Sequence, residues 1–448
     1  MDGESDLISK PIPELIKKIA IPASIGFFFN TLYNVVDTYY CGLWSTQALA
    51  AISLSFPIFF IIIAMGSGFS SGASALISNA LGSGDKQKAH WLATQTIAFN
   101  FFTSIIITAV GFLFAPSLFR LLGASDEYLA IALSYTNVIF LGTIFFFATF
   151  TLNSFLNAQG NTVIFRNLLI VGFILNVILD PAFMFGWWIL PEMGVPGVAW
   201  ATVLIQFLSA AFLTYYVGRT GLFDRECWHM FWPRREYFLQ IAKQGFPGSL
   251  NMMMTALGVF VITYFVTPFG KEAVAAFGIA TRVDQIAIMP TIGLNIAVLT
   301  LVGQNNGAGK IARVREVIKS SLFYGLVATF ISAVLVFIFA HSLMSAFSSD
   351  VNVVNMGVTY LHISIFVYWA YVILYIVVAS LQGLKKPQFA VWIGLFRQVL
   401  APLVAFSVLV NLLNFGIKGI WWGIFINTWI AVAVSYFYIK FVFRKKIS

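Results

Sequence analysis

Long apolar runs, separated by short polar segments, cover almost the whole chain. Each run provides the roughly 20 residues that an α-helix needs to cross a bilayer. Inside a bilayer the backbone groups must bond within their own segment, so such runs predict membrane-spanning helices. Twelve spans are expected, near residues 14–41, 47–79, 90–115, 128–157, 163–185, 196–217, 238–266, 272–302, 316–344, 352–381, 388–413 and 418–441.

The two halves of the chain resemble each other. When Pro22 is aligned with Pro247, the segment 22–84 pairs with 247–309 without a gap, and 15 of those 63 pairs are identical. Six spans per half is an even number, so both repeats enter the membrane in the same orientation. We therefore expect an all-α polytopic membrane protein with twelve transmembrane helices in two pseudo-symmetric six-helix bundles that rock against each other.

The expected domains follow from this repeat. The N-lobe, with the first six spans, covers 1–217, and the C-lobe, with the last six, covers 243–448. Between them, residues 218–242 are expected to form a cytoplasmic linker along the membrane interface, because they combine arginines with aromatic residues. The seventh span begins near residue 238.

Composition supports a membrane protein. The chain is 60% hydrophobic and only 10% charged, whereas a typical soluble domain has roughly 25% charged residues. The N-terminal segment 1–20 includes four acids and no small-residue cleavage site, so no removable signal peptide is expected. Of the two cysteines, Cys41 falls at the outer end of the first span and Cys227 in the cytoplasmic linker. Because they cannot meet, neither a disulfide nor a cysteine metal site is expected.

The basic residues indicate the orientation. With both termini in the cytoplasm, 21 of the 26 Lys and Arg lie inside and three lie outside, while Arg282 and Arg397 fall within or at the edge of spans. This bias follows the positive-inside rule, and it predicts a multi-pass protein of the plasma (bacterial inner) membrane with cytoplasmic termini. Because the charges are spread over short loops, nucleic-acid binding is not expected.

A few ionisable residues lie inside predicted spans, where each costs about 2.5 to 3.5 kcal/mol on insertion scales and so indicates a function. Asp37 is in the first span and Asp180 in the fifth. Asn30, Tyr33 and Asn34 precede Asp37 at helical spacing, which predicts a supporting polar face directed inward.

The same spacing places further oxygens near these acids. Asn176 lies four residues before Asp180, and Thr202 is in the sixth span. Carboxylate, amide and hydroxyl oxygens form a hard ligand set that suits a small cation such as Na⁺. Two neighbouring carboxylates also resist ionising together, so a proton competes with the cation. The alternative is that the aspartates are neutral packing groups and that Thr202 bonds its own backbone.

Other residues carry weaker signals. Arg282 and Asp284 could pair with each other or contact a substrate, and His362 is either a hydrogen-bonded core residue or a proton-sensitive site. The methionine and aromatic residues of the seventh span could line a cavity or could be ordinary packing. The residues proposed for a substrate cavity are Met252, Met253, Phe260, Tyr264, His362, Arg282 and Asp284.

Several segments carry a family resemblance that covers essentially the whole chain. NVVDTYYCG, LNVILDP, GVPGVAWAT and ISNALGSGD, with its second-half copy VGQNNGAGK, resemble the prokaryotic multidrug and toxic compound extrusion (MATE) transporters. This resemblance implies that Asp37, Asn176, Asp180 and Thr202 form the cation site and that Pro22 helps to bend the first helix.

One departure affects the branch. NorM-like members of this family are proposed to use carboxylates of the seventh and tenth helices, but here Ile262 replaces Asp37 in the repeat. Arg397 and Ala401 likewise replace Asn176 and Asp180. The resemblance is therefore to the DinF-like branch, with coupling in the first lobe.

The leading hypothesis is an antiporter that exports organic, cationic drugs or toxic compounds in exchange for Na⁺ or H⁺ by alternating access. It would be no enzyme and need no cofactor beyond the coupling ion. We expect a monomer whose partners are small organic substrates and membrane lipids.

The main alternative function is a lipid-linked oligosaccharide flippase of the same superfamily, and a passive channel is a further alternative. The sequence has no HExxH, GxSxG or GxxxxGK[ST] motif of an enzyme or an ATP-driven pump.

Overall fold

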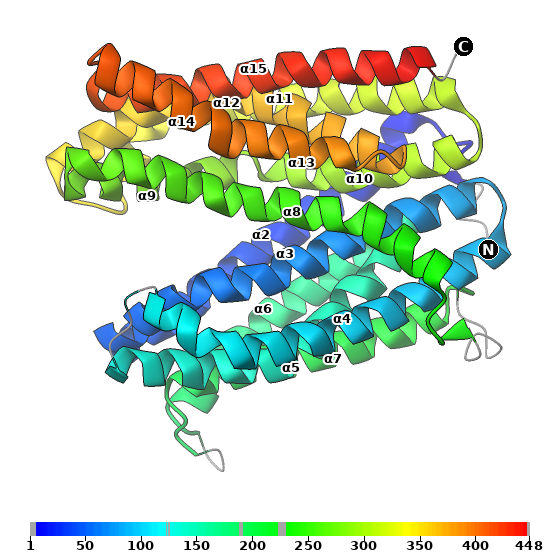
Figure 1. Ribbon diagram of the computed structural model, residues 1–448, viewed down its shortest axis with the longest axis horizontal. Coiled ribbons are helices and arrows are strands. Elements are labelled where there is room, and N and C mark those ends of the chain that lie inside the picture. The colour runs from blue at the N-terminus through cyan, green and yellow to red at the C-terminus, as the bar shows by residue number, and fades with distance from the viewer. Residues whose placement is uncertain (1–5, 122, 124–125, 188–190, 223–229, 446–448) are drawn as a thin grey trace. The chain divides into compact units, whose positions relative to one another are not determined.

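The computed structural model describes residues 6–121, 123, 126–187, 191–222 and 230–445, and all regular structure in these ranges is helical (Figure 1). The first half contains α2 (Ile12–Trp44), α3 (Thr46–Gly82), α4 (Lys86–Leu121), α5 (Asp126–Ala158), α6 (Val163–Met184) and α7 (Val195–Gly218). The second half contains α8 (Arg235–Val266), η2 (Thr267–Phe269), α9 (Lys271–Ala287), α10 (Met289–Gly307), α11 (Ile311–Ser345), α12 (Val351–Gly383), α13 (Gln388–Leu395), η3 (Phe396–Leu400), α14 (Ala401–Phe406), η4 (Ser407–Leu412) and α15 (Gly416–Lys445).

The predicted twelve-span topology is confirmed. Within the described ranges, 11 stretches are long and apolar enough to cross a membrane, and α9 with α10 makes a twelfth. That pair is bent by 47° at Ile288. Pro290, at the start of α10, explains the break, because it has no amide hydrogen to continue the hydrogen bonding of α9. The eighth predicted span is therefore a broken helix.

The eleventh predicted span also departs from a plain α-helix. It consists of α13, the π-helical η3, α14 and the π-helical η4 in direct succession. Each π-helical stretch holds an extra residue per turn, which rotates the side chains that follow. Such stretches often occur at functional sites.

Contacts divide the chain into two compact units. Unit 1 is Ile25–Ser249, and unit 2 joins the described residues before Ile25 to those from Leu250 onward. This division places the start of α2 in unit 2 and the start of α8 in unit 1. The predicted boundaries are different, because the predicted N-lobe covers 1–217 and the predicted C-lobe begins at residue 243. The predicted lobe boundaries stay a prediction about independent folding and motion.

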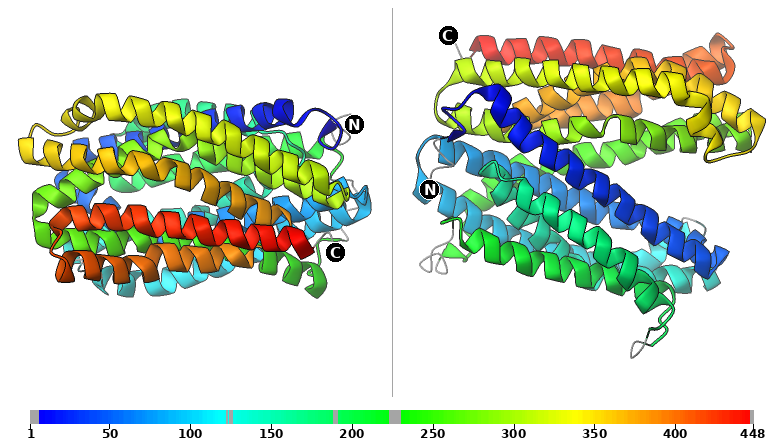
Figure 2. Two further views of the ribbon diagram at one scale, coloured as in Figure 1. Left: turned by 90° about the horizontal axis from the view of Figure 1, so that it is seen from above. Right: turned by 180° about the vertical axis from the view of Figure 1, so that it is seen from behind.

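The same packing pattern occurs in both units. In unit 1, α5 packs against α3, α4 and α7, and α6 packs against α7. In unit 2, α12 packs against α9 and α10, α11 and α15, while α14 packs against α15. Figure 2 shows these helices from two further sides. The repeat found in the sequence is therefore also a repeat of helix packing.

Short segments outside the helices are fastened to their own unit. Before α2, the carbonyl of Leu7 accepts a bond from Asn305 at 3.2 Å, and that of Lys10 accepts one from Arg313 at 2.7 Å. In unit 1, the side-chain amide of Gln95 on α4 donates to the carbonyls of Met230 and Trp232. These bonds hold the end of the predicted linker, whose residues 223–229, including Cys227, lie outside the described ranges.

Glycines allow α3 to lie against the first part of α8. A Cβ added at Gly72 would lie 2.6 Å from backbone atoms of Gly245, and one at Gly68 would lie 2.6 Å from the Cα of Ser249. The neighbouring atoms belong to the backbone, so they cannot rotate away. Close backbone approach through small residues is a common way for membrane helices to associate.

Gly72→Ala is therefore expected to destabilise the protein by about 1 to 3 kcal/mol, the usual effect of an overpacked contact. The measurement is thermal unfolding of the purified protein in detergent. The control is Gly278→Ala, because a Cβ at Gly278 meets no atom within 4 Å and alanine is the better helix former. Equal melting temperatures for the two variants would contradict the close contact.

Candidate functional site

Four of the predicted cation-site residues come together in unit 1. Asn176 of α6 donates from Nδ2 to Oδ1 of Asp37 on α2, at 2.8 Å. Asp180 lies one turn further along α6, and its carboxyl group interacts directly with that of Asp37. Asn176 and Asp180 are fully buried, and Thr202 of α7 is 3% exposed. The hydroxyl of Tyr33 on α2 donates to Oγ1 of Thr202 at 3.1 Å, which joins α7 to the cluster.

Pro181 contributes to the local geometry of this cluster. As a proline inside α6 it has no amide hydrogen, so the carbonyl of Val177, four residues earlier, has no helical donor. The hydroxyl of Tyr40 on α2 donates to this carbonyl at 3.2 Å. The proline therefore leaves an acceptor free on α6, and its bond to Tyr40 holds α2 against α6 close to Asp37 and Asp180. The sequence alone did not indicate this contact.

The cluster contains more acceptors than donors. Both carboxyl oxygens of Asp180 and Oδ1 of Asn176 are buried and have no hydrogen-bond partner in the described part of the chain. Buried polar atoms are almost always paired, since leaving one unpaired costs free energy. Two ionised carboxylates in contact would also repel each other. A bound cation or a proton would satisfy these oxygens and remove the repulsion.

The donor set fits a small monovalent ion better than a transition metal. Its atoms are carboxylate, amide and hydroxyl oxygens, the ligands that hard cations prefer. No group of three or more His, Cys, Asp or Glu suited to a metal ion occurs among the described residues. The chemistry of these oxygens is therefore compatible with the small-cation site that the sequence predicts, and that site stays a prediction.

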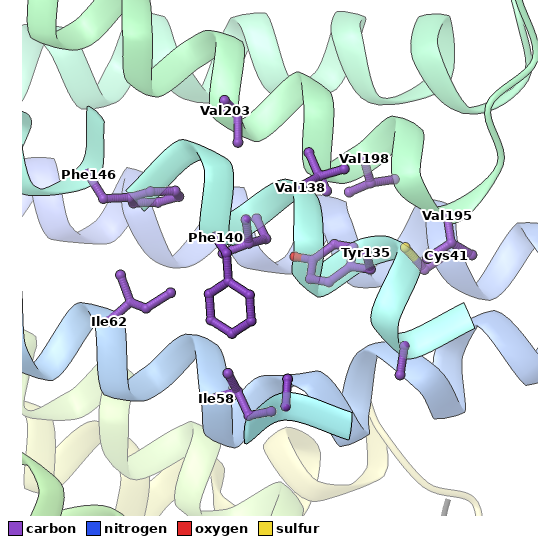
Figure 3. Close-up of a cluster of buried hydrophobic side chains, with 14 of the residues drawn as sticks. Cys41, Ile58, Ile62, Tyr135, Val138, Phe140, Phe146, Val195, Val198 and Val203 are labelled. Atoms are coloured by element: carbon purple, nitrogen blue, oxygen red, sulfur yellow. The ribbon is translucent and has the colours of Figure 1, made fainter. Parts of the chain in front are cut away.

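Two further side chains near the acids were not predicted from the sequence. Tyr135 of α5 and Cys41 of α2 are 6% and 0% exposed, and both interact electrostatically with Asp37 and Asp180. They belong to an apolar cluster with Val195 and Val198 of α7 (Figure 3). Such apolar surroundings exclude water and strengthen any charge interaction inside the site. The sequence shows Tyr135 as an ordinary aromatic residue of a span.

The rest of the predicted polar face lies elsewhere. Asn30 and Asn34 are exposed, and the side chain of Asn34 donates to the backbone carbonyl of Asn30 at 2.9 Å. Only Tyr33 of the three supporting residues reaches the cluster. Pro22 lies inside α2, which runs through it as one helix from Ile12 to Trp44, and its role in bending stays a prediction.

Unit 2 uses its buried acid differently. Asp284 of α9 accepts hydrogen bonds from Tyr360 at 2.8 Å, Ser364 at 2.9 Å and Tyr368 at 2.7 Å, all on α12. Arg282 is exposed and does not pair with it. The proposed Arg282–Asp284 pair is therefore not formed, because residues two apart point to different sides of a helix. Asp284 fastens α9 to α12.

The remaining residues proposed for a substrate cavity do not form one cluster. On α8, Phe260 and Tyr264 are 59% and 73% exposed, and Met252 and Met253 are partly buried. His362 is on α12, where its ring packs against that of Phe337 with the centroids 4.7 Å apart. A role for these residues in substrate binding stays a prediction.

The fold and the cluster define a class of protein. Two like bundles of transmembrane helices, with a cluster of buried acids inside one of them, are typical of secondary transporters. Comparison with protein families agrees, because the family model described as MatE matches residues 22–182 and again 247–407. The chain belongs to this family and is a membrane transporter, not an enzyme. The two matches begin at Pro22 and Pro247, the pair that starts the repeat in the sequence, which confirms that repeat.

Similar proteins support this assignment. The chain is 25% identical over 430 residues to the probable multidrug resistance protein YoeA of Bacillus subtilis, covering 95% of this chain and 93% of that protein. It is 29% identical over 357 residues to the probable multidrug resistance protein NorM of Thermotoga maritima, covering 78% and 76%. A solved structure of an outward-facing multidrug resistance MATE family transporter of the MOP superfamily has the same fold, with a TM-score of 0.92 at 24% identity, covering 100% of this chain and 99% of that one.

Proposed function

We propose that the protein is a cation-coupled antiporter that exports organic, cationic drugs or toxic compounds in exchange for Na⁺ or H⁺. The observation that carries this proposal is the buried cluster of unpaired acceptors at Asp180 and Asn176 beside Asp37. A coupling ion must bind where the protein offers charge and oxygen ligands without donors. The names of the relatives supply the substrate class, since two of them are called multidrug resistance proteins.

The residues of the cluster have distinct roles in this proposal. Asp37 and Asp180 provide the negative charge, and the oxygens of Asn176 and Thr202 complete the ligand set. Tyr33 donates to Thr202 and so fixes the direction of its hydroxyl oxygen. An ion that contacts Asp37 on α2 and Asp180 on α6 attracts the two helices to each other.

Coupling then follows from differential binding. An ion shifts a conformational equilibrium only by the difference in its affinity for the two states. A state in which α2 lies against α6 offers both carboxylates and binds the ion tightly. A state in which α2 has moved away offers fewer ligands, binds weakly and releases the ion. Substrate that prefers one of these states is linked to the ion by the same equilibrium.

We further propose a plasma-membrane location with both termini in the cytoplasm, and a monomer as the functional unit. The orientation rests on the distribution of Lys and Arg between the loops. In this orientation, inward gradients of Na⁺ or H⁺ drive the ion into the cell while substrate leaves.

Transport in inverted membrane vesicles tests the proposal. A fluorescent cationic dye is added, and a Na⁺ gradient and a H⁺ gradient are imposed separately. We expect uptake with at least one gradient and a loss of about 100-fold in Asp37→Asn, since removing a charge from an ion site costs several kcal/mol. Asn34→Ala, an exposed position on the same helix, should behave as the unmodified protein. Dye uptake at the same rate with and without each gradient would exclude antiport.

A further inference from the structure

Arg397 occupies the position in unit 2 that Asn176 occupies in unit 1 when the two repeats are aligned. In the same alignment, Ala401 replaces Asp180, and in the first span of the repeat Ile262 replaces Asp37. The second unit thus loses both carboxylates of the cation cluster and gains a guanidinium. The net charge over these three positions is therefore negative in unit 1 and positive in unit 2.

Arg397 is held well inside its span. The span runs from Gln388 to Leu412, and a helical rise of about 1.5 Å per residue places Arg397 roughly 14 Å from its start, near half the thickness of a bilayer core. It lies in the π-helical η3 and is partly buried. Its guanidinium carbon is 5.2 Å from the centre of the Tyr371 ring on α12.

No acid balances this charge. In the described part of the chain, no Asp or Glu lies within ion-pair distance of Arg397. Asp284, the buried acid of the same unit, already accepts three hydroxyl hydrogen bonds. A cation within a span is expensive, and a guanidinium has five N–H donors to satisfy. Tyr371 stabilises the charge through its ring and interacts with the guanidinium through its hydroxyl, but one acceptor cannot satisfy all five donors.

Amide groups lie where α8 meets this span. A Cβ at Gly394, three residues before Arg397, would lie 2.6 Å from Oδ1 of Asn251 on α8. A Cβ at Gly258, also on α8, would lie 2.6 Å from Oε1 of Gln398. The two glycines therefore let α8 and this span approach closely, with the amide oxygens of Asn251 and Gln398 where the two helices meet.

We infer that Arg397 and Tyr371 form an anion-binding subsite in unit 2. A planar guanidinium forms paired hydrogen bonds with carboxylate or phosphate oxygens, and the tyrosine ring beside it suits an aromatic or apolar body. The ligand is the carboxylate or phosphate of an amphiphilic molecule. This inference rests on the proposed function and places the contact for an acidic group of the substrate at Arg397 in unit 2.

Binding of a matched pair of dyes tests the subsite without requiring transport. The probes are rhodamine B, which has a free carboxylate, and its ethyl ester, measured by fluorescence anisotropy with purified protein in phosphatidylcholine nanodiscs. We expect Arg397→Gln to weaken rhodamine B binding about tenfold, the scale of one charge-assisted hydrogen bond, and ester binding less than twofold. Arg397→Lys should fall between, because it keeps the charge and loses the paired geometry.

The control is Arg315→Gln, which removes an exposed arginine of α11 in the same unit and should leave the binding of both dyes unaffected. Nanodiscs with phosphatidylglycerol distinguish the source of the anion. If this lipid weakens rhodamine B binding to the unmodified protein but not to Arg397→Gln, a lipid phosphate occupies the same subsite. Equal effects of Arg397→Gln on both dyes, or no preferential loss of rhodamine B, would overturn the inference. Because binding is measured without a gradient, the subsite is tested even if the transport experiment shows no coupling to Na⁺ or H⁺.

Discussion

Asp180→Asn is expected to lower gradient-driven export by about 100-fold or more, while the protein folds normally. Both oxygens of Asp180 are buried and unpaired, and its carboxyl group faces that of Asp37. The substitution keeps the shape of the side chain and removes the charge that attracts the ion. A single charge interaction of this kind is worth several kcal/mol, and a loss of about 1.4 kcal/mol corresponds to a factor of ten.

The measurement is dye uptake into proteoliposomes under an imposed Na⁺ or H⁺ gradient, at equal amounts of folded protein. Asp85→Asn is the matched control, because Asp85 is an exposed residue that caps α4 through the amide of Lys88, and asparagine caps equally well. Asp180→Glu should retain part of the activity, since it keeps the charge but displaces it by one methylene. Full activity of Asp180→Asn would remove Asp180 from the coupling site.

Asp284→Ala is expected to destabilise the protein by about 3 kcal/mol or more, because it leaves the hydroxyls of Tyr360, Ser364 and Tyr368 without their common acceptor inside unit 2. Hydrogen bonds to a charged group contribute about 1.5 to 3 kcal/mol each, and the losses do not add fully because they share one partner. Thermal unfolding in detergent measures the effect.

Two comparisons distinguish a structural role from a transport role. Arg282→Gln, at an exposed position two residues away, should change stability by no more than about 0.5 kcal/mol. Transport by Asp284→Ala, corrected for the fraction of folded protein, should remain close to normal. A variant that melts as the unmodified protein but no longer responds to the gradient would instead make Asp284 a coupling residue.

The topology could be predicted from the sequence because it depends on properties that are local. The length of each apolar run and the constant offset between the repeats indicated the twelve spans and the two bundles, and both are confirmed. The break at Ile288 and the π-helical stretches at Phe396–Leu400 and Ser407–Leu412 were not predicted. They depend on how the helix packs against its neighbours, to which apolar periodicity is insensitive.

The candidate site was predicted in part for a similar reason. Buried acids are rare, so Asp37 and Asp180 stand out in an apolar sequence. Spacing alone placed Asn34 on the same face as Tyr33, but a helical face is wide, and only Tyr33 reaches α7. Tyr135 was missed because a tyrosine in a span is common and only its tertiary contacts distinguish it.

The hydroxyl network around Asp284 shows the same limit. Its three donors are 76, 80 and 84 residues away along the chain. Their spacing of four on α12 becomes meaningful only when α9 is known to pack beside them. A nearby arginine in the sequence suggested a different partner, although the geometry of a helix separates residues two apart.

Proton binding by the purified protein tests most directly the claim that the cluster at Asp37 and Asp180 holds an exchangeable cation or proton. Acid–base titrations are compared for the unmodified protein and for the variant with both Asp37→Asn and Asp180→Asn, with and without Na⁺. We expect the unmodified protein to take up about one proton more than the variant as the pH falls, the behaviour of a carboxylate pair that shares a proton. If Na⁺ is the coupling ion, its addition should suppress this difference. Superimposable titration curves for the two proteins would contradict the account.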